Sequence, residues 1–365
     1  MPRHPVSRFA CRTVWSIVRL ALAALGLATA TAHAGTGLLV LAVEGQPPLT
    51  LAYPTSAPDT PIPRGPYILP AAPDAPPAGG NGRLVVLSHG SGGSFVTEID
   101  LARALVHAGF TVAMPEHAGD NWQDMRDVGP VSWARRPQEL SQAIDTVATL
   151  AAPGRRLAPL RLDVARVGVY GMSAGGIAAL TLAGARWSPA LQARHCDAHL
   201  AQDFAACVGL TTELTGGVLD GAKLAIARSV ILHKWADDTR WRTAHDPRVA
   251  AVVAAVPMAS PIDMASLAPP RVPLGLVRAG RDAWLAPRFH IDAVRAACEP
   301  HCTLLADLAE GGHGAPLSPP PVGLPPRAAR LLDDPPGFDR LRALPTVYDA
   351  IVNFYQTRLV CCPAN

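Results

Sequence analysis

Ser173 stands in the sequence GMSAG (residues 171–175), which follows a short apolar run and precedes a run of small residues. A G-x-S-x-G pattern between a strand and a helix is typical of a sharp turn that presents a serine hydroxyl above the edge of a sheet. The flanking glycines allow the strand and the helix to approach each other closely. A serine hydroxyl attacks a carbonyl only when a histidine takes its proton and a carboxylate orients that histidine. The pattern therefore predicts a nucleophilic serine and requires a histidine and a carboxylate elsewhere in the chain.

Two later residues follow predicted strands in the order that this chemistry requires, which is serine, acid, histidine. Asp282 comes directly after an apolar strand at 272–279, and His313 lies in the sequence GGHG just past a strand at 303–306. Glycines around the histidine allow its loop to fold back over the serine turn. We therefore predict that Ser173 is the nucleophile, Asp282 the acid and His313 the base.

Other carboxylates and histidines fit this pattern less well. Asp263 follows a predicted strand at 249–256 and is the runner-up acid, whereas Glu310 could serve only if the loop register differs. His290 lies in a predicted helix and His301 precedes a strand, so neither occupies the place expected of the base.

A glycine-rich turn follows an earlier buried strand at 83–87. Its sequence is SHGSGGS (residues 88–94), and a helix is predicted from about 96 to 108. Such a turn presents free backbone N–H groups to an anion, which in a serine hydrolase is the tetrahedral oxyanion. A plain strand-to-helix turn is the alternative, and the absence of G-K-[ST] disfavours phosphate. We expect His89 to brace this loop by hydrogen bonds.

Two further polar pairs are expected to have structural roles. Glu116 and His117 follow a strand at 111–114, and we interpret them as a pair that braces a loop, because no third metal ligand has suitable spacing. Arg135 and Arg136 open a predicted helix that runs to about residue 150, and we expect them to anchor nearby carboxylates or carbonyls. The sequence thus predicts neither a metal nor a cofactor.

Residues 1–34 have the features of a secretory signal peptide, with a basic start, an apolar stretch and a small-x-small cleavage site at 32–34. The apolar stretch is short for a membrane span, although an uncleaved anchor is the alternative. Removing this segment lowers the formal net charge from +3 to about −1, and nothing suggests nucleic-acid binding. We therefore predict a periplasmic or secreted protein without an integral membrane segment after cleavage, and leave its oligomeric state open.

Six cysteines remain after the predicted cleavage, and an even number in an exported chain favours disulfides. Short spacing suggests the pairs Cys196–Cys207 and Cys298–Cys302. We leave the state of Cys361 and Cys362 open, because a bridge between neighbouring cysteines is strained.

The pattern of strands and helices along the rest of the chain predicts one domain, from 35 to 365. Strands and helices alternate, so we expect a mostly parallel sheet covered by helices on both faces. Residues 186–247 interrupt this rhythm and are interpreted as a cap over the pocket, with a structural excursion as the alternative. Other expected segments are antiparallel strands at 37–43 and 49–53, an extended proline-rich strap at 54–82, a helix at 217–235, a second proline-rich loop at 315–337 and a closing helix at 344–359.

The combination of LVVLSHGSGGS, AMPEHAGD, ARRPQEL, VYGMSAGG, VRAGRDAWLAP and AEGGHG resembles the dienelactone hydrolase-like branch of the α/β hydrolases. Within that branch the sequence is most similar to bacterial relatives of plasma platelet-activating factor acetylhydrolase, over about residues 37–358. The resemblance implies the same catalytic set, Ser173, Asp282 and His313, with the backbone N–H groups of Ser91 and Ala174 as oxyanion donors. Dienelactone hydrolases themselves carry a cysteine nucleophile, so the serine here argues against that activity.

Family members cleave esters, often with short or oxidised acyl chains, without a metal or cofactor. The sequence thus predicts an exported serine carboxylic ester hydrolase, either a short-acyl esterase or lipase-like, whose partner is a small-molecule or lipid-like ester. A secreted serine peptidase or amidase on the same fold is the alternative. A non-catalytic binding protein on a hydrolase scaffold is a third reading, and it is disfavoured because all three catalytic residue types are present.

Overall fold

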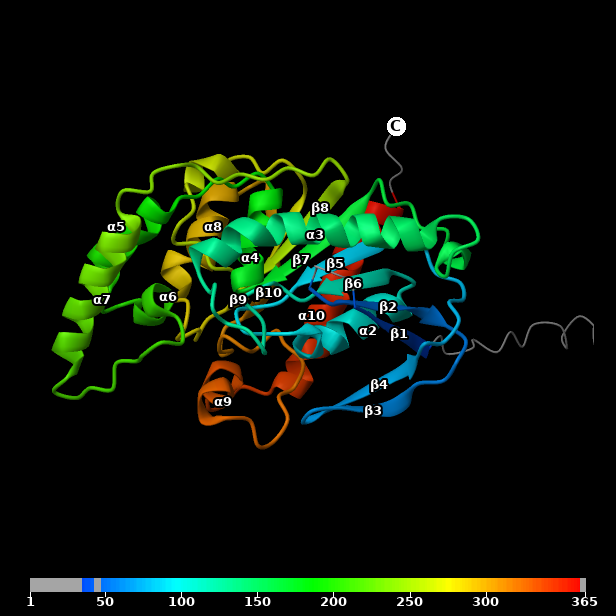
Figure 1. Ribbon diagram of the computed structural model, residues 1–365, viewed down its shortest axis with the longest axis horizontal. Coiled ribbons are helices and arrows are strands. Elements are labelled where there is room, and N and C mark those ends of the chain that lie inside the picture. The colour runs from blue at the N-terminus through cyan, green and yellow to red at the C-terminus, as the bar shows by residue number, and fades with distance from the viewer. Residues whose placement is uncertain (1–34, 43–46, 362–365) are drawn as a thin grey trace, which may run out of the picture.

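The computed structural model describes residues 35–42 and 47–361, so the predicted signal peptide and most of the turn near residue 45 lie outside the described residues. The described residues form one ten-stranded sheet in the order β10-β9-β8-β7-β5-β6-β2-β1-β4-β3 (Figure 1). Its strands are β1 (Gly35–Leu41), β2 (Leu49–Thr55), β3 (Thr60–Arg64), β4 (Tyr67–Pro73), β5 (Leu84–Ser88), β6 (Thr111–Pro115), β7 (Val167–Met172), β8 (Val249–Ala255), β9 (Leu274–Ala279) and β10 (Cys302–Leu308).

The central strands are parallel and buried. From β10 to β6 every neighbouring pair is parallel, and antiparallel pairing occurs at β2 with β6, β1 with β2 and β3 with β4. The sequences of β5 (LVVLS) and β7 (VGVYGM) are nearly continuous apolar runs, as expected for strands covered on both faces. Alternate side chains enter opposite cores, so that Val86 packs in one cluster and Val85 in the other.

Helices cover both faces of the sheet, with α3, α4 and α8 on one face and α2 and α10 on the other (Figure 1). Tyr355 fixes α10 to the sheet, because its hydroxyl donates a 2.7 Å hydrogen bond to the carbonyl of Val169 in β7. The helices are α2 (Ile99–His107), α3 (Pro130–Ala151), α4 (Ala174–Leu182), α5 (Pro189–His199), α6 (Phe204–Val208), α7 (Asp220–Trp235), α8 (Ile291–Cys298), α9 (Pro326–Leu332) and α10 (Arg340–Tyr355).

The insertion between α4 and β8 folds into α5, α6 and α7, which lie to one side of the sheet in Figure 1. These helices share a small apolar core that includes Phe204 and Ile231. The disulfide Cys196–Cys207 joins α5 to α6, as predicted, and the predicted helix at 217–235 is confirmed as α7. The insertion therefore has a core of its own and packs as a unit.

The second predicted disulfide, Cys298–Cys302, is also present and joins the end of α8 to the start of β10. Two disulfides are typical of proteins that fold in an oxidising compartment. Cys361 is exposed, and Cys362 lies outside the described residues. No helix within the part of the chain that the structure describes is long and apolar enough to cross a membrane.

Three expectations about secondary structure are wrong. The strap predicted at 54–82 contains the hairpin of β3 and β4, and prolines fit there because β3 is the edge strand and needs few backbone donors. The helix expected to open at Arg135 begins at Pro130, where the first turn requires no N–H, and Pro137 lies inside it. The second proline-rich loop contains α9, which also begins with a proline.

Glu98 ends the 3₁₀ turn Phe95–Glu98 before α2, and it is only 2% exposed. Thr97 donates a 2.6 Å hydrogen bond to its Oε2, while Oε1 has no partner among the described residues. Burial raises the pKa of this carboxyl group to about 8, so the folded protein holds a proton there that the unfolded chain releases near its ordinary value.

The free energy of unfolding should therefore decrease as the pH rises from about 4.5 to about 8, by up to about 1.4 kcal/mol per pH unit from this group. Glu98→Gln removes the titration, so the variant should gain stability relative to the unsubstituted protein as the pH rises. Urea unfolding at pH 5, 6.5 and 8 measures this difference, with the half-exposed Glu213→Gln as control. A stability difference that does not change with pH would contradict the prediction.

Candidate active site

Ser173 lies between β7 and α4 in a strained turn, with φ 56° and ψ −117°. Strain of this kind persists only where the surrounding structure imposes it, and it is found at functional sites. The glycines of the turn have no room for a side chain. A Cβ at Gly171 would lie 2.1 Å from the carbonyl oxygen of Gly175, and one at Gly175 would lie 1.9 Å from that of Ser88. The sequence therefore folds here as the expected strand–turn–helix.

The structure brings Ser173, His313 and Asp282 together in one chain of hydrogen bonds. His313 Nε2 lies 2.9 Å from Ser173 Oγ, and its Nδ1 lies 2.6 Å from Asp282 Oδ2. The carboxylate beside Nδ1 favours the proton on that nitrogen, which leaves the Nε2 lone pair facing the serine hydroxyl. Asp282 is held in place because its Oδ1 accepts two 2.8 Å hydrogen bonds, from the backbone N–H groups of Trp284 and Leu285.

The rival acids are occupied elsewhere. Asp263 accepts a 2.7 Å hydrogen bond from Arg186, and Glu310 pairs with Arg281. Since His313 contacts Asp282 and neither rival, the geometry favours the first choice of acid.

The glycine-rich turn lies against the serine. A Cβ at Gly90 would lie 3.3 Å from the Cβ of Ser173, and Ser91 and Ala174 line the same cavity as Ser173 and His313. Ala174 is the first residue of α4, where backbone N–H groups have no acceptor within the helix. The predicted oxyanion donors thus stand at the correct edge of the sheet, and their role remains a prediction.

A fully buried ion pair holds the glycine-rich turn at 88–94 in place. Arg136 Nη2 donates a 2.8 Å hydrogen bond to Asp120 Oδ2, and neither side chain is accessible to solvent. Asp120 Oδ1 accepts a 3.0 Å hydrogen bond from the backbone N–H of Gly92, and Arg136 also donates to the carbonyl of His89. Burial opposes ionisation of Asp120, but the Arg136 charge outweighs it and lowers the pKa of the carboxyl group. The expectation that this arginine anchors carboxylates and carbonyls is confirmed.

A second buried chain of hydrogen bonds runs from Ser88 through His117 to Glu139. His117 Nε2 lies 2.7 Å from Ser88 Oγ, and Nδ1 lies 2.6 Å from Glu139 Oε2. Burial and the charge of Arg136 hold the pKa of His117 well below its ordinary value. The chain resembles the arrangement at Ser173, but Ser88 and His117 are wholly buried, so no substrate reaches them. The predicted pairing of His117 with Glu116 is wrong, because the histidine turns inward to α3.

His89 braces the turn, as expected. Its Nδ1 lies 2.7 Å from the carbonyl oxygen of Gly90, and its Nε2 accepts a 3.3 Å hydrogen bond from the backbone N–H of His117. These two backbone partners require a neutral ring with the proton on Nδ1. Burial, with the neighbouring His117 and Arg136, lowers the pKa of His89 well below its ordinary value, which agrees with a neutral ring. His89 therefore acts as a brace and is not available as a base.

One group of side chains, His195, Asp203 and His290, is close enough together to hold a metal ion. Asp203 Oδ2 lies 2.7 Å from His195 Nε2 and 2.9 Å from His290 Nε2, and its Oδ1 accepts a hydrogen bond from the backbone N–H of Ala286. Burial opposes ionisation of Asp203, but both histidine contacts lower the pKa of its carboxyl group.

His290 disfavours a metal at this group. Its Nδ1 accepts a 3.0 Å hydrogen bond from the backbone N–H of Ala259, so the proton of the neutral ring is on Nε2, the nitrogen that a metal would need. A metal-bound histidine instead donates from its other nitrogen. The group therefore joins the insertion to the segment after Asp282 by hydrogen bonds, and the ring of His195 also contacts that of Phe289.

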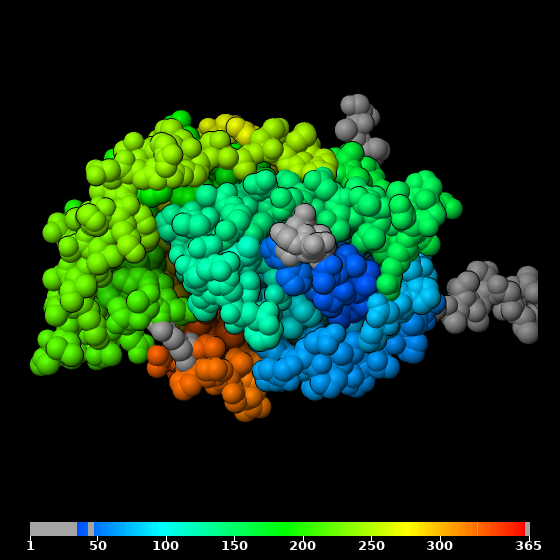
Figure 2. All heavy atoms as spheres, in the orientation of Figure 1, coloured from blue at the N-terminus to red at the C-terminus, as the bar shows by residue number. Residues whose placement is uncertain are grey.

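The cavity beside Ser173 has a volume of about 900 Å³. Its walls come from the turn at 90–97, from the segment between β6 and α3, from the insertion and from α9, and Figure 2 shows a hollow between the green insertion and the orange α9. Trp122, Met125, Trp133, Trp235 and Trp284 make much of this lining apolar. Residues 205–210 also line the cavity, as expected if the insertion covers the site.

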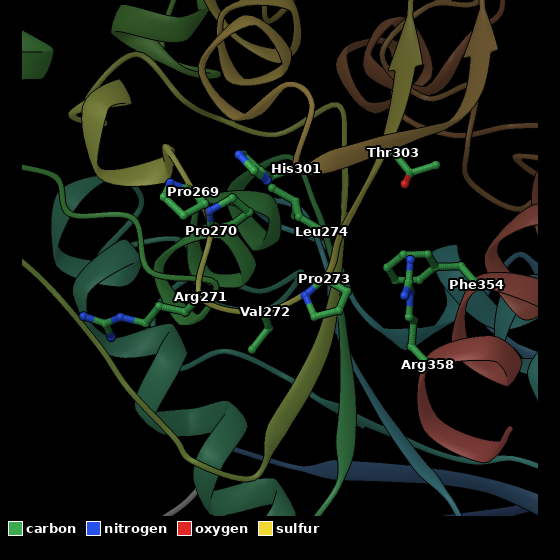
Figure 3. A pocket seen from close by; sticks show the side chains of 10 residues that line it. All are labelled: Pro269, Pro270, Arg271, Val272, Pro273, Leu274, His301, Thr303, Phe354 and Arg358. Atoms are coloured by element: carbon green, nitrogen blue, oxygen red, sulfur yellow. The ribbon is translucent and has the colours of Figure 1, made fainter. Parts of the chain in front are cut away.

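A smaller hollow of about 280 Å³ lies at the opposite edge of the sheet, beside the first residues of β9 and β10 (Figure 3). Arg271 and Arg358 line it but extend in different directions, and Arg358 lies over the ring of Phe354. Since its charged groups do not converge on one point, this hollow is not a second candidate for chemistry.

No family model matches the sequence, and no curated protein matches it. A solved structure with a similar fold is the ferulic acid esterase from Streptomyces cinnamoneus, with a TM-score of 0.54 and 20% sequence identity. The match covers 92% of this chain and 95% of that chain. Together with the mostly parallel sheet, this likeness shows that the chain has the α/β-hydrolase fold, which confirms the predicted fold class.

Proposed function

We propose that this protein is an exported serine hydrolase that cleaves carboxylic esters through an acyl-enzyme. The observation that carries the proposal is the hydrogen-bonded chain Ser173–His313–Asp282 at the wall of a large apolar cavity. The esterase with a similar fold and the sequence resemblance to the dienelactone hydrolase-like branch support the same class of reaction. The two disulfides are consistent with export.

In the first half of the reaction, Ser173 Oγ attacks the ester carbonyl while His313 Nε2 takes the hydroxyl proton. Asp282 keeps the imidazole oriented and stabilises its charged form. Backbone N–H groups of Ser91 and Ala174 hold the tetrahedral oxyanion, and the proton on His313 then passes to the leaving alcohol.

In the second half, water attacks the acyl group on Ser173, and His313 again takes and returns the proton. The acid is released and the serine regains its hydrogen. Apart from the water molecule, both halves use only these side chains and backbone donors.

The size and apolar lining of the cavity favour esters larger than acetate. Buried methylene groups each contribute about 0.8 kcal/mol, so kcat/KM should rise at least about 10-fold from acetate to octanoate in a p-nitrophenyl ester series. A steep fall beyond butyrate would contradict this prediction and indicate a confined acyl pocket. If the folded protein cleaves matched p-nitroanilides but no ester, the peptidase or amidase alternative replaces the proposal.

A further inference from the structure

Glu116 is the one carboxylic acid among the described residues that line the cavity beside Ser173. The lining contains three other titratable side chains, which are the exposed Arg64, the half-buried Tyr67 and the candidate base His313. A single buried acid in a mostly apolar wall is unusual, because burying a polar group without a partner is unfavourable.

The carboxyl group of Glu116 has spare capacity to accept hydrogen bonds. The residue is 8% exposed, and its backbone N–H is already satisfied by the carbonyl of Pro48 at 2.9 Å. Burial raises the pKa of the carboxyl group, and a hydrogen bond with Trp122 offsets part of that rise. Trp122 is the one side-chain partner that the described part of the chain gives it, whereas a carboxyl group has several acceptor sites.

Strand register places Glu116 and Ser173 at the same edge of the sheet, with one strand between them. Ser88 at the end of β5 is level with Gly171 in β7, and Val86 in β5 is level with Ala113 in β6. Two strand spacings amount to about 10 Å. The turn at 90–95 crosses this interval and forms the cavity wall between the two residues.

The wall of the same cavity is rich in aromatic side chains, including Phe95, Trp122 and Trp133. Such side chains stack favourably on an aromatic ligand. We propose that Glu116 forms a subsite for a hydroxyl group carried at the end of an aryl arm of the ester. This inference rests on the proposed function, and it names the class of substrate as hydroxyaryl esters.

The test compares two methyl esters that differ by one oxygen, methyl 3-(4-hydroxyphenyl)propanoate and methyl 3-phenylpropanoate. For the unsubstituted protein we expect kcat/KM to be about 10- to 100-fold higher for the hydroxylated ester, because a hydrogen bond to a buried acid discriminates by that amount. A ratio near 1 overturns the inference.

Variants then show whether Glu116 is responsible. In Glu116→Leu the ratio of the two kcat/KM values should fall to near 1, and in Glu116→Gln, which keeps an acceptor oxygen, it should be intermediate. Glu213→Leu removes an exposed acid that does not line this cavity and should leave the ratio unchanged. A ratio that persists in Glu116→Leu also overturns the inference.

The two proposals fail in distinguishable ways. If the proposed function is wrong, neither methyl ester nor p-nitrophenyl butyrate is cleaved in a reaction that needs Ser173. If only the subsite is wrong, p-nitrophenyl butyrate is cleaved normally and the two methyl esters are cleaved equally well.

Discussion

Replacing Ser173 by alanine should reduce kcat for p-nitrophenyl esters by at least about four orders of magnitude while the fold remains intact. The substitution removes the hydroxyl that lies 2.9 Å from His313 Nε2, so no acyl-enzyme can form. His313→Ala should have an effect of similar size, because residues that act as one unit contribute together. Steady-state kinetics combined with thermal unfolding followed by circular dichroism measure activity and fold separately.

Ser88 provides a sharp control, since it also lies in a chain of serine, histidine and acid. A fluorophosphonate probe should label Ser173 in the unsubstituted protein and in Ser88→Ala, and should label nothing in Ser173→Ala. Peptide mapping of the probe to Ser88, or ester hydrolysis at the original rate in Ser173→Ala, would contradict the assignment.

The position of the candidate triad could be predicted because each member follows a strand. Parallel strands end at one edge of a sheet, so Ser173, Asp282 and His313 come together there although 140 residues separate the serine from the histidine. The local disulfides were predictable for a similar reason, because short spacing leaves few other geometries. These inferences need the order of elements and not the details of packing.

The roles of Asp120 and Glu139, the two acids that hold the loops beside Ser173, could not be predicted, because these roles depend on tertiary packing. Glu139 lies one helical turn after Arg135, which by itself indicates only a surface ion pair along a helix. The start of α3 was predicted too late because proline is common in the first turn of a helix, so Pro137 indicated a helix that begins beside it. In the structure Pro137 lies inside a helix that begins at Pro130. Once α3 begins at Pro130, the same helix brings Arg136 to the carbonyl of His89 in the glycine-rich turn and Glu139 to the backbone N–H of Ala118 after β6.

The hairpin at the far edge of the sheet was missed because prolines in β3 conceal a strand pattern. Edge strands tolerate proline, but whether a strand is at an edge is a property of the assembled sheet. This hairpin has consequences for the site, since Arg64 and Tyr67 reach the cavity beside Ser173. Part of the wall of this cavity therefore comes from a hairpin that the sequence did not indicate.

The second large effect is expected at Asp120, whose carboxylate joins Arg136 to the backbone of the glycine-rich turn. Asp120→Asn keeps the shape of the side chain but leaves Arg136 buried without its counter-charge, which should destabilise the protein by about 3–5 kcal/mol. The amide would also hold Gly92 and its neighbours less firmly. If this turn supplies an oxyanion donor, kcat should fall by about 10- to 100-fold. This loss is smaller than the loss expected when such a donor is removed altogether, because the donor here is only displaced.

A matched control separates stability from catalysis. Asp246 is also a buried acid paired with an arginine, Arg248 at 2.7 Å, but it precedes β8 at the opposite edge of the sheet from Ser173. Asp246→Asn should therefore lower stability without changing kcat. An alkyl boronic acid, which forms a tetrahedral adduct with the serine, should bind Asp120→Asn more weakly and Asp246→Asn normally, each assayed well below its unfolding temperature. If both variants lose stability and neither loses affinity for the boronic acid, the ion pair of Asp120 and Arg136 stabilises the fold but does not position the oxyanion donors. Other contacts must then hold those donors in place.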